Sequence, residues 1–226
     1  MSAHIATLFT QDEHGRLMCV NEPDGGQAPR FFLGRTRHGC ESRVRDDLVD
    51  SDVLDALTSA CSDEPPLEDV PGPAPAPTRY EALLARSGPI QRVWAGPAFH
   101  FPPHLIPSPR AVPVTAANAE VLRTHLASWL PDVAIGRPLF AVMAGGHAVA
   151  ICGSARTTAV AHEAGVETAP AFRGCGYATE AVAAWAMAVR DLGVTPLYST
   201  SWQNHASRAL ARRLGLRLFG ADLHIT

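Results

Sequence analysis

The segment that most constrains the fold is one in which an alternating run passes through a glycine-rich turn directly into a long amphipathic helix. Residues 159–168 alternate as a strand does, and Arg173-Gly-Cys-Gly-Tyr-Ala178 follows shortly after. The spacing of apolar residues then predicts a helix over residues 176–192, which Gly193 ends. A strand, turn and helix in this order is typical of a mixed α/β fold.

The turn itself has the properties of a phosphate site. Gly174 and Gly176 would let the backbone come close to a ligand, and the amino end of the helix adds a partial positive charge. No Gly-Lys-Ser/Thr follows, and the glycines lack the spacing of the dinucleotide-binding motif, so neither nucleotide motif fits. For the turn taken alone, an ordinary strand-to-helix connection remains the alternative.

Further elements are predicted on both sides of this segment. Thr115 would cap a helix that Pro131 ends, and Gly145-Gly146 joins two apolar runs in the manner of a hairpin. The C-terminal part predicts strands over residues 196–201 and 216–225, with a helix over residues 205–214 between them.

The N-terminal half predicts short elements without a recognisable motif. Strands are expected over residues 5–9, 17–20 and 30–33, and Asp50 and Thr78 would each cap a helix. Residues 70–78 contain four prolines and predict an extended connector. Gly96-Pro97 would divide a strand into two pieces. The charged residues between positions 35 and 47 suggest a solvated face, with substrate capture as the alternative.

Residues at three separate places resemble the GCN5-related N-acetyltransferases (GNAT). Arg173, Gly176 and Ala178 match that family's Arg/Gln-x-x-Gly-x-Gly/Ala motif. Asn204-His-Ala-Ser207 and Leu214-Gly-Leu216 resemble the Asn-x-x-Ser and Leu-Gly-Phe pattern of the branch that is similar to ribosomal-protein acetyltransferases. The resemblance covers residues 112–226. It implies a mixed, mostly antiparallel sheet flanked by helices in a GNAT domain at residues 111–226, after an additional N-terminal α+β segment at residues 1–110.

The resemblance also implies where acetyl-CoA binds. Backbone groups of residues 166–168 would bind the pantetheine arm, and the motif would hold the pyrophosphate. Asn204 would reach the pantetheine or fix the splayed strand edge, and the helix that carries Ser207 would lie beside the thioester. The expected acetyl-CoA-binding residues are Val166, Glu167, Thr168, Arg173, Gly174, Cys175, Gly176, Tyr177, Ala178, Asn204 and Ser207.

Catalysis in this family is a direct attack by an amine, so a base and a proton donor are needed. Glu163 is the expected base, with Glu167 as the second candidate. Many members carry a tyrosine donor where this chain has Ala211, and Ser207 is the expected substitute. Tyr177 and Tyr198 are the alternatives for the donor.

Two other chemistries fit the sequence less well. Cys175 at a helix amino end suggests an acyl-cysteine, yet no histidine is tied to it in sequence, and a small loop residue is the simpler interpretation. His100 and His104 have a metal-like spacing, but the two prolines between them and the absence of a third ligand nearby argue against a metal.

Composition excludes several classes of protein. The net charge is −3 without a basic stripe, which argues against a nucleic-acid partner, and no apolar run reaches the roughly 18 residues of a membrane span. The five scattered cysteines are expected to be free thiols of a cytoplasmic protein. All 19 basic residues are arginine, which together with the many alanines and prolines indicates a GC-rich genome, and a bacterial source is expected. A homodimer is left open.

These features predict an N-acetyltransferase that uses acetyl-CoA and no metal. Its acceptor would be a primary amine of a small molecule, such as a metabolite, an amino-sugar or an antibiotic. Two alternatives stay open: acetylation of a protein amino terminus or lysine, and a non-catalytic sensor that binds acyl-CoA.

Overall fold

The chain forms two compact units in the computed structural model, which describes residues 1–67, 78–106 and 108–226. The first unit consists of Met1–Phe99, Ser199–Arg208 and Leu218–Thr226, and the second of His100–Tyr198 and Ala209–Arg217. The C-terminal strand thus belongs with the N-terminal residues, whereas the predicted domains met near residue 110; that boundary stays a prediction. The connector predicted at residues 70–78 lies, apart from Thr78, outside the described residues.

The second unit is built on a five-stranded arrangement. Its strands lie in the order β10 (Thr195–Ser199), β9 (Ala161–Thr168), β8 (His147–Thr157), β7 (Leu139–Ala144) and β6 (Ala111–Pro113). All neighbours are antiparallel except β9 and β10, which are parallel. Gly145 and Gly146 turn between β7 and β8 with φ of 57° and 83°, which confirms the predicted hairpin. The mixed, mostly antiparallel α/β architecture is therefore also confirmed.

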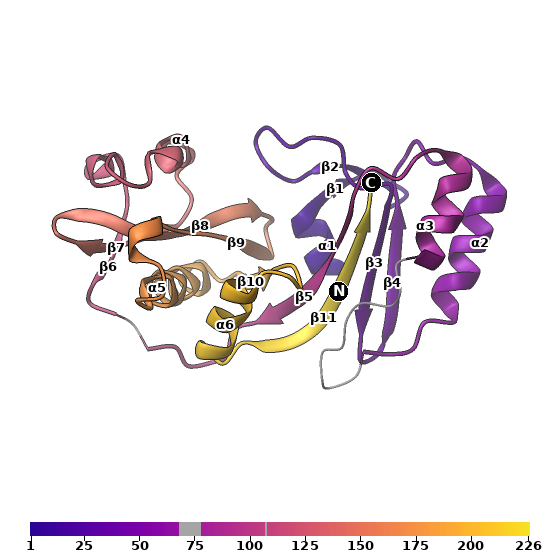
Figure 1. The fold of residues 1–226 in the computed structure, drawn as a ribbon. Coiled ribbons are helices and arrows are strands. Elements are labelled where there is room, and N and C mark those ends of the chain that lie inside the picture. Colours follow the sequence, from indigo (N-terminus) through magenta and orange to yellow (C-terminus); the bar gives the residue numbers. More distant parts are fainter. Residues whose placement is uncertain (68–77, 107) are drawn as a thin grey trace. The chain divides into compact units, whose positions relative to one another are not determined.

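Helices lie on both sides of these strands. Figure 1 shows α4 (Leu130–Ile135) and α5 (Tyr177–Asp191) on opposite sides of β8 and β9. Helix α5 faces the sheet with the apolar side predicted from its spacing, since Val182, Trp185 and Val189 are fully buried. The amino end of α5 therefore follows shortly after the end of β9, where the chain leaves the sheet.

The single helix predicted between Thr115 and Pro131 is wrong. The chain instead makes two 3₁₀ turns, η2 (Ala119–Leu122) and η3 (Ala127–Trp129), before α4. Pro131 lies in the first turn of α4, where a missing N–H costs no hydrogen bond, so it begins a helix rather than ending one. Leu122 and Leu126 are nevertheless buried, against Leu139 and Ile151.

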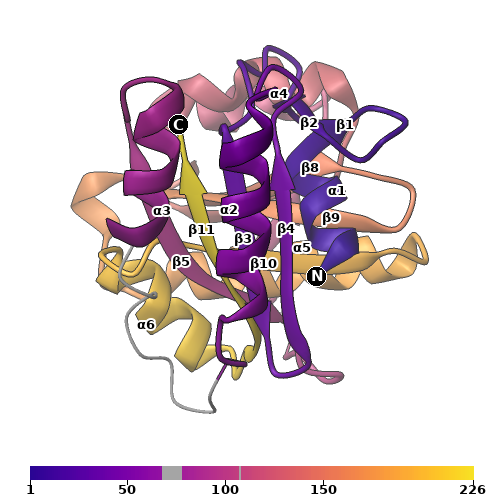
Figure 2. The same cartoon turned by 90° about the vertical axis from the view of Figure 1, so that its right-hand side faces the viewer.

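The first unit also consists of strands that are covered by helices. Its main strands lie in the order β4 (Gly39–Val44), β3 (Phe31–Thr36), β11 (Arg217–Ile225) and β5 (Val93–His100), and β1 (Phe9–Gln11) pairs with β2 (Leu17–Val20). The helices are α1 (Ser2–Leu8), α2 (Ser51–Ser62), α3 (Thr78–Leu84) and the 3₁₀ turn η1 (Ala85–Ser87). Figure 2 shows α2 and α3 over one face of β3 and β11. Phe31 packs on that side, whereas Phe32 packs with Ile5 and Leu8 of α1 on the other.

Two strand predictions in this unit are wrong. Residues 5–8 are part of α1, because Ile5 and Leu8 share one helical side and bury it. Gly96-Pro97 does not divide β5, which runs continuously from Val93 to His100. The Pro97 carbonyl accepts a hydrogen bond from the Thr200 N–H at 3.2 Å, so the strand keeps a partner there although proline donates none.

The helix predicted from Asp50 is confirmed. The Asp50 carboxylate accepts a hydrogen bond from the Val53 N–H at 3.2 Å and so caps α2. Within the described ranges, no helix has both the length and the apolar character that crossing a membrane requires.

Candidate functional site

Strand β9 presents two different faces. Its register with β8 pairs Gly153 with Gly165 and Cys152 with Val166, so odd-numbered and even-numbered residues point to opposite sides. The odd-numbered side, which carries Glu163 and Glu167, faces the indole of Trp129. The two candidate bases therefore share one face of the strand, as the alternation in the sequence predicted.

The pairing between β9 and β10 ends early. It joins Ala161 to Thr195, His162 to Pro196 and Glu163 to Leu197, and goes no further. Residues 164–168 keep β8 on one edge, while no described strand pairs with their other edge. An edge of this kind presents backbone N–H and C=O groups that a ligand can bind. Val166, Glu167 and Thr168, predicted to hold the pantetheine arm, lie along it.

The turn after β9 leads straight to the amino end of α5. After η4 (Pro170–Phe172), Gly174 and Gly176 have φ of 79° and 85°, a conformation that favours glycine. A Cβ atom on Gly174 would meet no described atom within 4 Å. Gly176 is the N-cap of α5 and supplies no side-chain hydrogen bond, so the first-turn N–H groups receive no cap from it. This is the geometry of an anion site.

Arginines surround this turn. The guanidinium of Arg173 folds back, its Nε–H donating to the Thr168 carbonyl at 3.3 Å. The guanidinium of Arg110 forms an ion pair with Glu180 in the first turn of α5 and lies 5.1 Å from the centre of the Tyr177 ring. Arg213 comes within 3.9 Å of the position that a Cβ of Gly176 would take. Arg173 was predicted from the sequence, whereas Arg110 and Arg213 were not, because their positions depend on elements distant in the chain.

Glu163 and Glu167 differ in their surroundings. Glu163 is only 2% exposed and lies opposite Arg156 in the register with β8. Glu167 is partly exposed, and its carboxylate accepts a hydrogen bond from the Trp129 Nε1–H at 2.6 Å. Trp129 was also missed, because nothing in a sequence links two residues 38 positions apart.

The glycines of β8 and β9 explain how Trp129 reaches Glu167. A Cβ on Gly153 would lie 3.0 Å from a carbon of the Trp129 ring, and one on Gly165 would lie 3.2 Å from another. Two paired glycines thus make a flat patch on which the indole rests. The ring is held over the sheet, and its N–H is directed at the carboxylate.

His162 lies on the opposite face of β9. Its Nδ1 lies 2.9 Å from the Ser154 hydroxyl, which accepts a hydrogen bond from the buried Trp185 Nε1–H at 3.0 Å. Burial, and secondarily the positive charge of Arg137, lowers the pKa of His162. These contacts give His162 a packing role on the side of α5.

Asn204 and Ser207 are in the first unit, whereas the other predicted site residues are in the second. The side-chain oxygen Oδ1 of Asn204 accepts a hydrogen bond from the Ser207 N–H at 3.0 Å and so caps α6 (His205–Arg213). Ala211, at the position of the family's tyrosine, is buried. The roles of Asn204 in binding and of Ser207 as proton donor stay predictions.

Cys175 is an exposed turn residue whose thiol lies 3.7 Å from the Arg173 carbonyl. Cys175 is predicted to contribute to phosphate binding through its backbone, and its position in the turn allows this. In the part of the chain that the structure describes, no group of three or more His, Cys, Asp or Glu side chains could hold a metal ion.

Comparisons with known proteins identify the family of the chain. A search of curated proteins finds no match. Among solved structures, a GCN5-related N-acetyltransferase-like protein from Streptococcus suis is similar, with 16% identity, a TM-score of 0.52, and coverage of 99% of this chain and 98% of that one. A GNAT-family acetyltransferase from Colwellia psychrerythraea has 14% identity, a TM-score of 0.50, and coverage of 82% and 75%.

A GNAT-family protein from Novosphingobium aromaticivorans has 18% identity and a TM-score of 0.51, and the match covers 60% of this chain and 65% of that one. At these identities the likeness concerns the fold alone. The family model of the acetyltransferase (GNAT) domain matches residues 91–217, more than half of the sequence. The chain therefore belongs to the GNAT acetyltransferase family.

Proposed function

We propose that the chain binds acetyl-CoA along the edge of β9 and transfers the acetyl group directly to a primary amine of a small molecule. The observation that carries the proposal is the early end of the β9 and β10 pairing after Glu163 and Leu197. It leaves the backbone of residues 164–168 open on one edge, directly before a glycine turn and the amino end of α5. An amide-rich arm followed by a diphosphate has the chemistry that suits these two features in that order.

The reaction needs one bond formed and one broken. The amine nitrogen attacks the thioester carbonyl carbon, a C–N bond forms, and the C–S bond breaks to release the CoA thiolate. The proton lost by the nitrogen goes to a carboxylate, and the thiolate takes up a proton. Glu163 is the proposed base, because this buried carboxylate lies at the last position of β9 that pairs with β10, directly before the open edge of residues 164–168.

The acceptor is proposed to be a small amine that carries a positive charge. Glu163 and Glu167 lie on the same face of β9, and the indole of Trp129 lies beside Glu167. Carboxylates and an indole are groups that attract an ammonium ion before it loses its proton. An amino-sugar, an amino-acid-like metabolite or an aminoglycoside antibiotic would meet this description.

The experiment is an assay of CoA release with the purified full chain, acetyl-CoA and a panel of acceptors. The panel holds amino-sugars, amino acids, polyamines, aminoglycosides and, as the contrasting class, peptides with a free amino terminus or a lysine. We expect turnover with at least one small amine. Turnover with peptides alone would replace the small-molecule acceptor by a protein, and binding of acetyl-CoA without turnover on any amine would favour a sensor.

Two matched variants separate the carboxylates. Glu163→Gln keeps the shape of the side chain but not its basicity, so we expect kcat to fall by about 100-fold or more while the Kd for acetyl-CoA is retained. Glu167→Gln on the same face should leave kcat within a few-fold and raise KM for the amine. The reverse ranking would assign the base to Glu167.

A further inference from the structure

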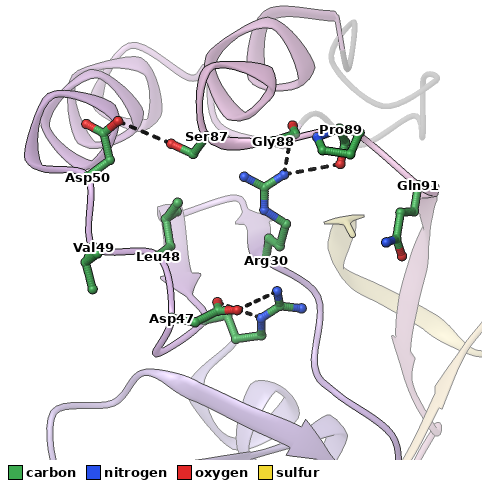
Figure 3. A pocket seen from close by; sticks show the side chains of 10 residues that line it. Arg30, Asp47, Leu48, Val49, Asp50, Ser87, Gly88, Pro89 and Gln91 are labelled. Carbon is green, nitrogen blue, oxygen red and sulfur yellow. Dashed lines mark hydrogen bonds and ion pairs between the residues drawn. The ribbon is translucent and has the colours of Figure 1, made fainter.

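The first unit contains a pocket whose lining residues have no role in the proposed acetyl transfer. Its volume is about 400 Å³, within the usual range of small-molecule sites. Its walls come from the residues around the ends of β3, β4 and α3 and from the start of α2 (Figure 3). Of its lining residues only Gln91 falls within the segment that matches the acetyltransferase family. The charged residues that sequence analysis left as a solvated face contribute to it.

Arg45 and Asp47 form one wall of the pocket. The guanidinium of Arg45 donates from Nε and from one terminal nitrogen to the two oxygens of Asp47, both at 2.8 Å, and from the other terminal nitrogen to the Ala28 carbonyl at 3.0 Å. Arg45 is 8% exposed and thus fixed in place. The bond from Arg45 holds the pKa of the Asp47 carboxyl below its usual range. This pair is electrically neutral.

Arg30 brings a second positive charge to the pocket. Its charge also acts on Asp47, after that of Arg45, so the two guanidinium groups share one carboxylate and one positive charge is in excess. The Arg30 guanidinium donates to the carbonyls of Leu84 at 3.0 Å, Gly88 at 3.2 Å and Pro89 at 3.4 Å. All three partners are neutral, and among the described residues no carboxylate forms an ion pair with it. Figure 3 shows the guanidinium directed at the Gly88 and Pro89 carbonyls, with Asp47 on its other side. A rigidly held arginine whose charge is not fully neutralised is suited to a carboxylate ligand.

A negative charge, that of Asp50, lies at another wall of the pocket. One oxygen of Asp50 caps α2, and from the described residues the other accepts a long hydrogen bond of 3.4 Å, donated by the Ser87 hydroxyl. Pro89 and Leu48 also line the pocket, but Leu48 is only 4% exposed because it packs in the core, whereas Val49 is 78% exposed. The pocket therefore combines an excess positive charge, an anion that retains acceptor capacity, and a small apolar area.

We propose that this pocket binds a free α-amino acid with a small aliphatic side chain. The carboxylate of the ligand would meet Arg30, its ammonium group would meet Asp50, and its side chain would meet Pro89 and Val49. The pocket shares no lining residue with the proposed acetyl-CoA site, so the proposal does not depend on transferase activity. It would give the chain a second small-molecule ligand.

The test is calorimetric titration of the full chain with valine and with its two halves, 3-methylbutanoate, which lacks the amine, and isobutylamine, which lacks the carboxylate. We expect valine to bind at least about tenfold more tightly than either half, because each charge-assisted hydrogen bond contributes roughly that factor. Equal or undetectable binding of all three at millimolar concentration would overturn the proposal. Binding of 3-methylbutanoate as tight as that of valine would replace the amino acid by a simple carboxylate.

Two variants test the walls separately. Asp50→Asn keeps a helix-capping residue but removes the charge, so valine should bind about tenfold more weakly and 3-methylbutanoate should be unaffected. Arg30→Gln should abolish binding of both. Arg86→Gln, an exposed arginine in η1 that does not line the pocket, should change neither.

Loss of binding in Arg86→Gln, or unchanged valine binding in Asp50→Asn, would contradict the proposal. Thermal melting of each variant shows whether it is folded. Because Arg30 also binds three carbonyls, Arg30→Gln could unfold the region, and in that case the wild-type ligand comparison and Asp50→Asn still decide.

Discussion

His4 and Asp222, 218 positions apart in sequence, are joined by a 2.7 Å contact between Nε2 and a carboxylate oxygen. Both side chains are buried, with exposed fractions of 1% and 0%. The contact attaches α1 to β11, so it links the two ends of the chain within the first unit. Asp222→Ala should lower the free energy of unfolding by about 3 kcal/mol, because it leaves a buried polar ring without its partner. Urea unfolding measures the loss.

The matched control for this change is Asp24→Ala, at an exposed turn position. A surface change of this kind should stay within about 0.5 kcal/mol of the wild type. Similar losses in the two variants would show that the His4 contact contributes nothing in particular to stability.

Gly96 should tolerate no side chain. A Cβ at this position would lie 1.8 Å from the Thr200 carbonyl oxygen, and the Thr200 N–H is bonded to Pro97 next to it. Because the obstacle is backbone, Gly96→Ala should destabilise the chain by about 3 kcal/mol or more and lower its Tm by several degrees. Gly26→Ala is the control, since its Cβ would meet nothing within 4 Å. A Tm for Gly96→Ala equal to that of Gly26→Ala would contradict the packing described.

These two sites also show where sequence analysis fails. Residues 5–8 lack a helix signal of their own, and the burial of His4 against Asp222 is set by the other end of the chain. The proline of Gly96-Pro97 suggests a break, yet Thr200 supplies the partner that continues β5. In both cases a contact distant in sequence overrides the local preference.

The same difference between local and distant contacts separates the turns and caps from the surroundings of the candidate site. The hairpin at Gly145, the cap at Asp50 and the glycine turn before α5 were predictable, because each depends on a few neighbouring residues. The contact of Trp129 with Glu167 was not, since it requires Gly153 and Gly165 to lie side by side on different strands. Turn chemistry is local, whereas the surroundings of a carboxylate are not.

His162 should make stability depend on pH in one window. Burial lowers its pKa in the folded chain below the value of 6.5 expected when it is exposed. As pH falls below about 6.5, the unfolded chain binds the proton more readily than the folded one, so stability decreases until the lowered pKa is passed. His162→Gln should remove this part of the pH dependence in urea titrations. His14→Gln, at an exposed histidine, should retain it, and an unchanged slope in His162→Gln would refute the assignment.

Two glycines at opposite ends of α5 can separate backbone strain from ligand binding. Gly176 before the helix has φ of 85°, and Gly193 after it has φ of 78°. Alanine at either position is strained to a similar degree, so each variant should lose about 1 kcal/mol of stability. Only Gly176→Ala adds a methyl group to the proposed phosphate turn.

We therefore expect Gly176→Ala to weaken acetyl-CoA binding by about tenfold or more, because the methyl group keeps the diphosphate from the first-turn N–H groups of α5. Gly193→Ala should bind acetyl-CoA as the wild type does, since a Cβ there meets no described atom within 4 Å. Calorimetric titration with acetyl-CoA measures both. Equal losses of affinity in the two variants would mean that strain in α5, and not the turn, controls binding, and unchanged affinity in Gly176→Ala would move the diphosphate to another part of the chain.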